Sequence, residues 1–278
     1  MRFFTAPDGA RITYYETGAG RPLLLLHGLM AHGGFFRFQD ELADSFRLIN
    51  VNLRGHGGSE ARPEITVERL ASDITALVDA LNLEDAIAVG WSLGATILWH
   101  VLAGSASHRF AGSIIVDMTP KVLNEGDWHL GLSEDVCAAR SAAIRDDYRS
   151  LALTAGQAIF SQPLNDTTRP LADWAGEEFA RNDPKAIGRL WESLVAQDLR
   201  PLLPRVRQKS LVLRGAHSQL YGPGTAGYLA QTLPDASAIE FSRSAHAPHL
   251  EEPALFNSII REFAAGLPHL PHIETAHS

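Results

Sequence analysis

Residues 86–102 read AIAVGWSLGATILWHVL, a short apolar run, a serine flanked two residues away by glycines, and a second apolar run. The first run, from Ala86 to Gly90, has the length and content of a strand buried on both faces, and the second, from Leu93 to Leu102, has the length of a helix. The glycines of a G-x-S-x-G motif in this context leave room for a strained turn that lifts the serine Oγ above the sheet. We therefore predict that Ser92 is a nucleophile, the alternative being a serine that only caps the helix.

Strands and helices alternate along most of the chain. Arg2 to Thr5 and Arg11 to Glu16 flank the turn Pro7-Asp8-Gly9 and predict an opening hairpin. An amphipathic helix is expected from Val67 to Leu81, after the cap residue Thr66. Such alternation favours right-handed crossovers and a parallel sheet, so we expect an α/β fold. The other expected strands are Pro22–His27, Arg47–Asn52, Ala86–Gly90, Ser113–Asp117, Ser210–Arg214 and Ser237–Phe241.

The alternation stops between about Thr119 and Pro204, where only helical runs appear. We expect a core formed by residues 1–118 and 205–266, and an inserted helical cap at residues 119–204. The chain from residue 267 to 278 is expected to be a disordered tail. The helical runs of the cap are Glu134–Tyr148, Leu151–Phe160, Leu171–Arg181 and Lys185–Leu199, separated by Pro163, Pro170 and Pro184.

Three further segments accompany GWSLG: LLLLHGLM at 23–30, RGHGGS at 54–59 and SAHAPHLEEP at 244–253. In this order, the four motifs resemble those of the α/β-hydrolase superfamily, over residues 10–265. The resemblance implies a mostly parallel eight-stranded sheet with helices on both faces. It also implies that His246 is the catalytic base, and that the backbone N–H groups of Leu29 and Leu93 form an oxyanion hole.

Two other histidines compete with His246 for the role of base. His249 lies three residues further on, at the front of the following helix, and we interpret it as a cap or packing residue. His56 belongs to the RGHGGS segment, and we interpret it as a residue that organises its loop.

The acid of the expected triad departs from the usual pattern. In the superfamily it normally follows the penultimate strand, where this chain has Ser218. Serine carries no charge to stabilise an imidazolium ion. Asp117 follows the strand next to the nucleophile strand and so lies at the carboxyl edge of the sheet, where some superfamily members carry their acid. We predict Asp117 as the acid, with a cap for the loop Met118-Thr119-Pro120 as the alternative role.

The composition excludes several classes of function. A net charge of −8 without a Lys/Arg-rich face argues against a nucleic-acid partner. The N-terminus lacks a signal-peptide pattern, and the longest apolar run, Leu23 to Leu26, is too short to span a bilayer, so we expect a cytoplasmic protein without a membrane partner. The single cysteine, Cys137, suggests packing rather than catalysis. The histidines near the C-terminus fit no zinc template, and we expect no metal or other cofactor.

A serine, a histidine and an aspartate with an oxyanion hole imply acyl transfer to water. We expect a small or medium apolar carboxylic ester or lactone as substrate, contacted by Met30, Trp91, Trp128 and Phe160. Alternatives on the same triad are perhydrolysis and the hydrolysis of amide, thioester or carbon–carbon bonds. A ligand receptor with slow hydrolysis is a further alternative. The expected partner is the small-molecule substrate, with a homodimer left open.

Overall fold

The computed structural model describes residues 1–61 and 64–270 of the chain. Its centre is an eight-stranded sheet with the order β1-β2-β4-β3-β5-β6-β7-β8. The six strands from β3 to β8 are mutually parallel, whereas β1 and β2 pair antiparallel at one edge. The strands are β1 Arg2–Thr5, β2 Arg11–Thr17, β3 Arg21–Leu26, β4 Phe46–Val51, β5 Ala86–Trp91, β6 Phe110–Val116, β7 Lys209–Gly215 and β8 Ala236–Phe241.

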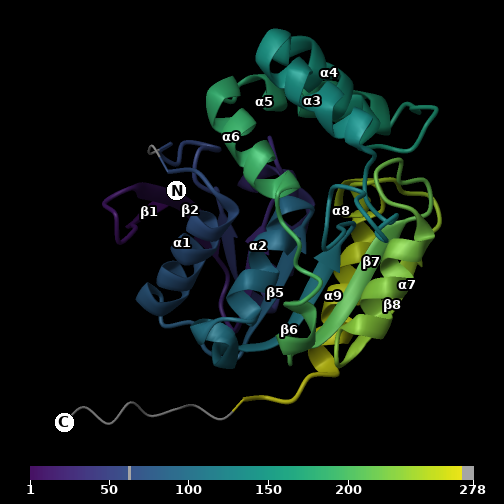
Figure 1. The fold of residues 1–278 in the computed structure, drawn as a ribbon. Coiled ribbons are helices and arrows are strands. Elements are labelled where there is room, and N and C mark those ends of the chain that lie inside the picture. Colours follow the sequence, from purple (N-terminus) through teal and green to yellow (C-terminus); the bar gives the residue numbers. More distant parts are fainter. Residues whose placement is uncertain (62–63, 271–278) are drawn as a thin grey trace.

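Helices pack on both faces of this sheet (Figure 1). The helices α1 (Val67–Ala80) and α2 (Leu93–Leu102) lie together on one face, and η1 (Gly33–Asp44) lies with α9 (Pro253–Ala265) on the other. Further helices are η2 (Ser105–Arg109), η3 (Leu203–Arg205), α7 (Pro223–Thr232) and α8 (Pro248–Glu251). This arrangement confirms the expected α/β architecture.

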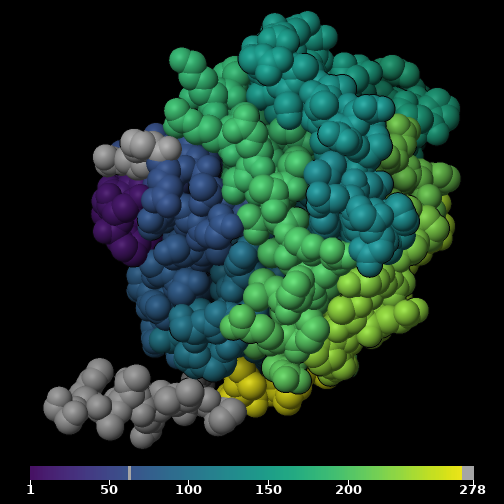
Figure 2. All heavy atoms as spheres, in the orientation of Figure 1, coloured from purple at the N-terminus to yellow at the C-terminus, as the bar shows by residue number. Residues whose placement is uncertain are grey.

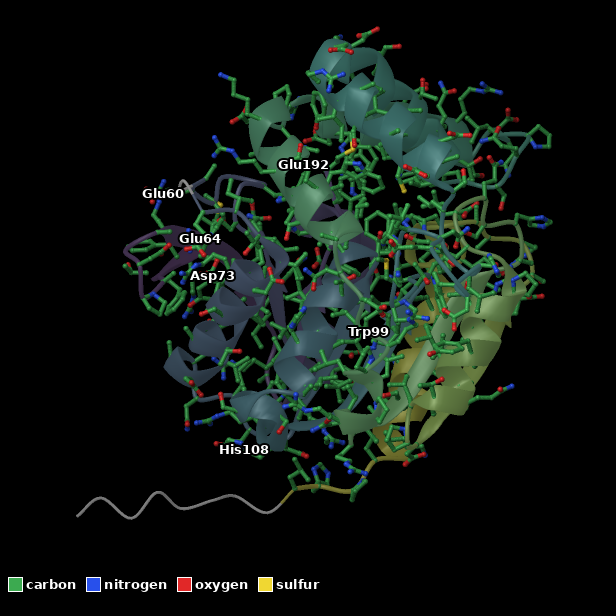
Figure 3. The ribbon with its side chains drawn as sticks, in the orientation of Figure 1. Glu60, Glu64, Asp73, Trp99, His108 and Glu192 are labelled. Atoms are coloured by element: carbon green, nitrogen blue, oxygen red, sulfur yellow. The ribbon has the colours of Figure 1, made fainter. Side chains whose placement is uncertain are left out.

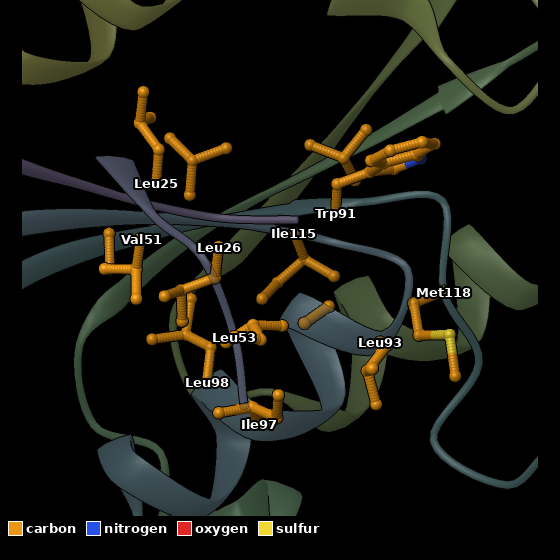
Figure 4. Close-up of a cluster of buried hydrophobic side chains, with 14 of the residues drawn as sticks. Leu25, Leu26, Val51, Leu53, Trp91, Leu93, Ile97, Leu98, Ile115 and Met118 are labelled. Carbon is orange, nitrogen blue, oxygen red and sulfur yellow. The ribbon is translucent and has the colours of Figure 1, made fainter. Parts of the chain in front are cut away.

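The parallel strands are apolar because both of their faces are covered. Leu23 to Leu26 of β3 and all six residues of β5 are buried. Around the end of β5, Figure 4 shows Leu93 and Ile97 of α2 beneath Leu26 and Ile115 of the sheet. The strand-to-helix turn that contains Ser92 therefore rests on a packed core, which limits its movement.

An internal ion pair fixes the loop after β4. Arg54 donates from its Nε to Asp73 Oδ2 and from its Nη2 to Asp73 Oδ1, each at 2.7 Å. Both side chains are buried, and Figure 3 shows Asp73 on α1. Since breaking a buried pair leaves an uncompensated charge, this contact holds the RGHGGS segment in place.

Between β6 and β7 the chain forms four α-helices, followed by the short η3: α3 (Glu134–Asp146), α4 (Tyr148–Ala158), α5 (Thr168–Ala180) and α6 (Pro184–Val195). We call residues 119–204 the cap. In the space-filling view its teal and green atoms cover the top of the molecule and continue down the front (Figure 2). The helices α4 and α5 approach closely at two glycines, because a Cβ on Gly156 would lie 2.2 Å from the backbone nitrogen of Gly176.

Two expectations differ from the structure in detail. Pro170 does not separate helices but lies in the first turn of α5, where the backbone N–H that proline lacks would have no helical partner. At the C-terminal end, Leu267 is buried and Leu270 donates its backbone N–H to Asp85 at 2.9 Å. Residues 267–270 therefore pack against the core, and the rest of the expected tail lies outside the described residues. No helix in the described ranges is long and apolar enough to cross a bilayer.

Candidate active site

Ser92 occupies a strained turn between β5 and α2. Its φ of 53° and ψ of −120° form a backbone conformation that residues with a side chain rarely adopt. A Cβ on Gly90 would lie 2.6 Å from the Cα of Ala95, and a Cβ on Gly94 would lie 2.1 Å from the carbonyl oxygen of Leu26. Ser92 stands at the N-cap position of α2 but makes no side-chain capping hydrogen bond. The turn thus leaves the hydroxyl available at the positive end of the helix dipole.

His246 and Asp117 form a hydrogen-bonded pair. The Nδ1 of His246 lies 2.6 Å from Asp117 Oδ2, and both side chains are almost fully buried. Because a carboxylate only accepts, we assign the Nδ1 proton to the imidazole, which leaves Nε2 of the neutral ring as an acceptor. Asp117 directly follows β6, and His246 follows β8. The carboxyl ends of parallel strands thus supply both groups.

Trp91, next to Ser92 in the chain, holds the loop that carries His246. The indole Nε1 of Trp91 donates to the backbone carbonyl of His246 at 2.8 Å, and both residues are buried. This bond joins the end of β5 to the loop after β8. It fixes the position of the imidazole relative to the serine.

Ser218, at the usual position of the acid, contacts the same carboxylate. Its Oγ donates to Asp117 Oδ2 at 2.6 Å, so that one oxygen accepts from both the imidazole and the hydroxyl. Asp117 has a φ of 43°, a backbone conformation that aspartate and asparagine tolerate better than most residues. Its side chain bonds to His246 and Ser218 rather than to the backbone of the Met118-Thr119-Pro120 loop.

The expected oxyanion-hole residues, Leu29 and Leu93, belong to two segments that meet near Ser92. Leu93 is the first residue of α2, whose N–H has no acceptor within the helix. Leu29 follows Gly28, where a Cβ would lie 3.2 Å from the Cβ of Ser92. The loop after β3, which carries Leu29, thus approaches Ser92 closely.

His249 has surroundings unlike those of His246. Its ring lies between those of Phe36 and Trp91, with centroid separations of 5.0 and 4.6 Å. Neither ring nitrogen has a hydrogen-bond partner among the described residues. Burial in this apolar site lowers the pKa of His249 to about 3, so the ring stays neutral at ordinary pH. The residue packs in the core.

His56 is engaged within its own loop. Its Nε2 accepts the N–H of Met30 at 3.2 Å, and its Nδ1 donates to the carbonyl of Arg54 at 3.0 Å. Burial lowers the pKa of His56 to about 4. The side chain therefore links the loop after β4 to the loop that carries Leu29.

A cavity of about 330 Å³ opens beside Ser92, between core and cap. Its size falls in the range of small-molecule sites. Ser92 and His246 line it together with Met30 and Trp91 from the core. The other lining residues are Gly28, Leu29, Leu132, Val136, Arg140, Ile144, Leu151, Ala155, Ala158, Ile159, Phe179, Gln219 and Leu220.

Two expected substrate contacts lie elsewhere in the cap. Trp128 packs edge-on against Tyr228, and its Nε1 donates to the carbonyl of Lys121 at 2.8 Å. Phe160 is fully buried. Neither residue lines the cavity, so we do not carry Trp128 and Phe160 into the proposed substrate site.

The sequence motifs did not point to the cap residues that do line the cavity. Val136, Arg140 and Ile144 lie one turn apart along α3, which turns one stripe toward the cavity. Their four-residue spacing is visible in the sequence. This spacing shows that the three residues share one face of the helix, but it does not show whether that face lines a cavity or packs against another helix.

Proteins of known function resemble this chain over most of its length. A curated relative, the pimeloyl-(acyl-carrier protein) methyl ester esterase of Chromobacterium violaceum, is 30% identical over 244 residues, covering 85% of this chain and 92% of that protein. An esterase from Exiguobacterium antarcticum superposes with a TM-score of 0.89 at 23% identity, covering 95% of this chain and 99% of that one. The enol-lactonase from Burkholderia xenovorans superposes with a TM-score of 0.85 at 22% identity, covering 95% of this chain and 100% of that one.

At these identities the two solved structures show the fold alone. The family comes from a separate match: a model described as the alpha/beta hydrolase family covers residues 23–259. This span contains all four sequence motifs and the whole cap, and it confirms the resemblance on which the motif assignments rest. The chain belongs to the α/β-hydrolase family.

Proposed function

We propose that this chain is a serine esterase that hydrolyses small or medium carboxylic esters or lactones through an acyl-enzyme. The observation that carries the proposal is the bond between Asp117 and His246 at a cavity that His246 and Ser92 line together. A hydroxyl, a neutral imidazole and a buried carboxylate in this order are the groups that acyl transfer requires.

In the acylation step, Ser92 Oγ attacks the ester carbonyl while Nε2 of His246 takes the hydroxyl proton. The carbonyl oxygen becomes an oxyanion, which accepts hydrogen bonds from the N–H groups of Leu29 and Leu93. When the tetrahedral intermediate collapses, the alkoxide leaves with the proton from His246. The products are the alcohol and the acyl-enzyme.

Deacylation repeats the sequence with water in place of the serine. His246 takes a proton from water, and the resulting hydroxide adds to the acyl carbonyl. The second intermediate collapses to release the carboxylic acid, and the proton returns to Ser92. Asp117 stabilises the imidazolium ion that forms in both steps and holds the ring with Nε2 as acceptor.

The curated relative, named as a methyl ester esterase, supports ester hydrolysis over the other reactions open to the same triad. The mainly apolar wall of the cavity supports a substrate with a hydrocarbon portion. These two observations favour an ester with an aliphatic chain.

Labelling with a fluorophosphonate tests the nucleophile. We expect intact-mass analysis to show one adduct on the wild-type chain and none on Ser92→Ala, which should also lose p-nitrophenyl butyrate hydrolysis. Ser258→Ala, on the exposed side of α9, is the matched control and should label normally. Normal labelling and turnover of Ser92→Ala would overturn the proposal.

A further inference from the structure

The cavity above Ser92 contains a cation that ester hydrolysis does not use. Arg140, on α3, contributes to its wall, and the other described lining residues include no lysine, arginine, aspartate or glutamate. A guanidinium group keeps its charge at all relevant pH values. The mainly apolar site thus has one permanently charged group.

Arg140 has no ionic partner among the residues that the structure describes. Other arginines of the cap do: Arg145 pairs with Asp146, and Arg149 pairs with Glu177. The contact recorded for Arg140 is with a ring, since its Cζ lies 5.0 Å from the ring centroid of Trp191. In a chain with a net charge of −8, a cavity-lining cation without a carboxylate partner is unusual.

Trp191 is itself held in place. The residue belongs to α6 and is 2% exposed. Its Nε1 donates to Ser141 Oγ at 3.0 Å, and Ser141 donates to the carbonyl of Cys137 at 3.1 Å. The ring therefore supports one face of the Arg140 guanidinium while the N–H donors around its edge remain available.

Two ionisable groups that interact with Arg140, Tyr221 and Cys137, do not supply a counter-charge. Burial raises the pKa of the Tyr221 hydroxyl well above its ordinary value and raises the pKa of the Cys137 thiol, while the Arg140 charge acts in the opposite direction on both. Both groups are therefore neutral at physiological pH. The Tyr221 ring lies 6.5 Å from that of His246.

An unpaired cation facing an apolar cavity loses hydration that a ligand anion can replace. The planar fork of a guanidinium matches a carboxylate with two parallel N–H···O bonds. We propose that Arg140 is a specificity residue that binds a carboxylate on the substrate, so that the preferred esters are half esters with one free carboxylate and an aliphatic chain. This inference rests on the proposed esterase function.

Two matched series of esters test the proposal. In the first, p-nitrophenyl half esters of linear dicarboxylic acids are compared with p-nitrophenyl alkanoates of equal chain length, which places the carboxylate on the acyl side. In the second, acetates of ω-hydroxy acids are compared with alkyl acetates, which places it on the alcohol side. The readout is the ratio of kcat/KM for the charged and neutral members of each pair.

We expect this ratio to exceed one in at least one series for the wild-type chain. In Arg140→Met the ratio should fall roughly 10- to 100-fold, because one partner of a desolvated charge pair is removed. The fall should come mainly from a higher KM for the charged esters. Arg140→Lys should recover part of it. Arg145→Met, one turn further along α3 and exposed, should keep the wild-type ratio. High salt should reduce the ratio in the wild-type chain.

A ratio at or below one in both series, or an equal ratio in Arg140→Met and the wild type, would overturn the inference. Arg140 would then only pack on Trp191, and the variant would lower the melting temperature without changing the ratio. These outcomes leave the esterase proposal standing as long as the wild-type chain hydrolyses the neutral esters. If it hydrolyses neither kind, the proposed function itself fails.

Discussion

The role of Asp117 can be tested by moving its charge. Asp117→Asn keeps the shape of the side chain and suits the left-handed backbone at this position, because asparagine tolerates a positive φ about as well as aspartate. The change removes the negative charge from the oxygen that lies 2.6 Å from His246 Nδ1. The fold should therefore persist while the imidazolium ion loses its partner.

We expect kcat to fall by roughly 10³ to 10⁴, as acid-to-amide changes do in such triads. At about 1.4 kcal/mol per factor of ten, this loss corresponds to roughly 4 to 5.5 kcal/mol of transition-state stabilisation. Rates of p-nitrophenyl butyrate hydrolysis at saturating substrate give the change in kcat. Thermal melts of the same samples show whether the fold is retained.

A second variant restores the charge from the neighbouring loop. Ser218 Oγ already contacts Asp117 Oδ2 at 2.6 Å, so Ser218→Asp in the Asp117→Asn background places a carboxylate beside the imidazole. The new amide at position 117 can donate an N–H to it. We expect at least tenfold recovery of kcat. In the otherwise wild-type chain, Ser218→Asp brings two carboxylates together and should lower activity.

Two results would refute this reasoning. If Asp117→Asn keeps kcat within about threefold of the wild type, the acid lies elsewhere or the enzyme works as a serine–histidine dyad. If the double variant is no faster than Asp117→Asn, the two loops are not alternative positions for one charge.

Ser218→Ala should lower kcat by up to about tenfold, since it removes one of two donors to Asp117, and an unchanged rate would show that the hydroxyl is dispensable. For His249, the folded-state pKa of about 3 lies below the unfolded value of about 6.5, so stability falls as pH drops from about 6.5 toward 3. His249→Phe should reduce the loss of unfolding free energy between pH 7 and pH 5 by roughly 2 kcal/mol in urea titrations, and an equal loss in both proteins would contradict this. Asn182→Ala removes the side-chain N–H that donates to the carbonyl of Met30 at 2.6 Å. The loop that carries Leu29 and Met30 should then be held less firmly, and kcat should drop roughly 3- to 10-fold. A lower melting temperature with unchanged kcat would show that the bond serves stability alone.

The fold could be predicted from the sequence because local signals and the global arrangement agree. The strands are apolar on both faces, the nucleophile turn has its glycines, and Thr66 caps α1 by accepting from the N–H of Arg69 at 3.1 Å. The helix η1 and the helix α7 were not among the expected elements. The first is a kinked 3-10 helix that starts with two glycines, and the second contains Gly224 and Gly227, so neither shows strong helical periodicity.

The candidate site likewise has a part that the sequence predicted, in the core, and a part that it did not, in the cap. Motifs after core strands pointed to Ser92 and His246, and the position of Asp117 at the carboxyl edge pointed to the carboxylate. The cap carries no such motifs, and an aromatic residue is buried whether it faces a cavity or packs in the core. Trp128 and Phe160 are buried away from the cavity, whereas Arg140, which the sequence did not single out, lines it.

The bond from Trp91 Nε1 to the carbonyl of His246 bears on how the substrate range of such an enzyme can evolve. It links the turn of Ser92 to the loop of His246 through the core alone, and Asp117 also follows a core strand. The cap supplies walls of the cavity but none of these three groups. Substitutions in the cap can therefore alter which ester fits while the reacting groups keep their alignment. Selection, or an engineer who randomises α3 and α4, can explore new substrates without rebuilding the chemistry.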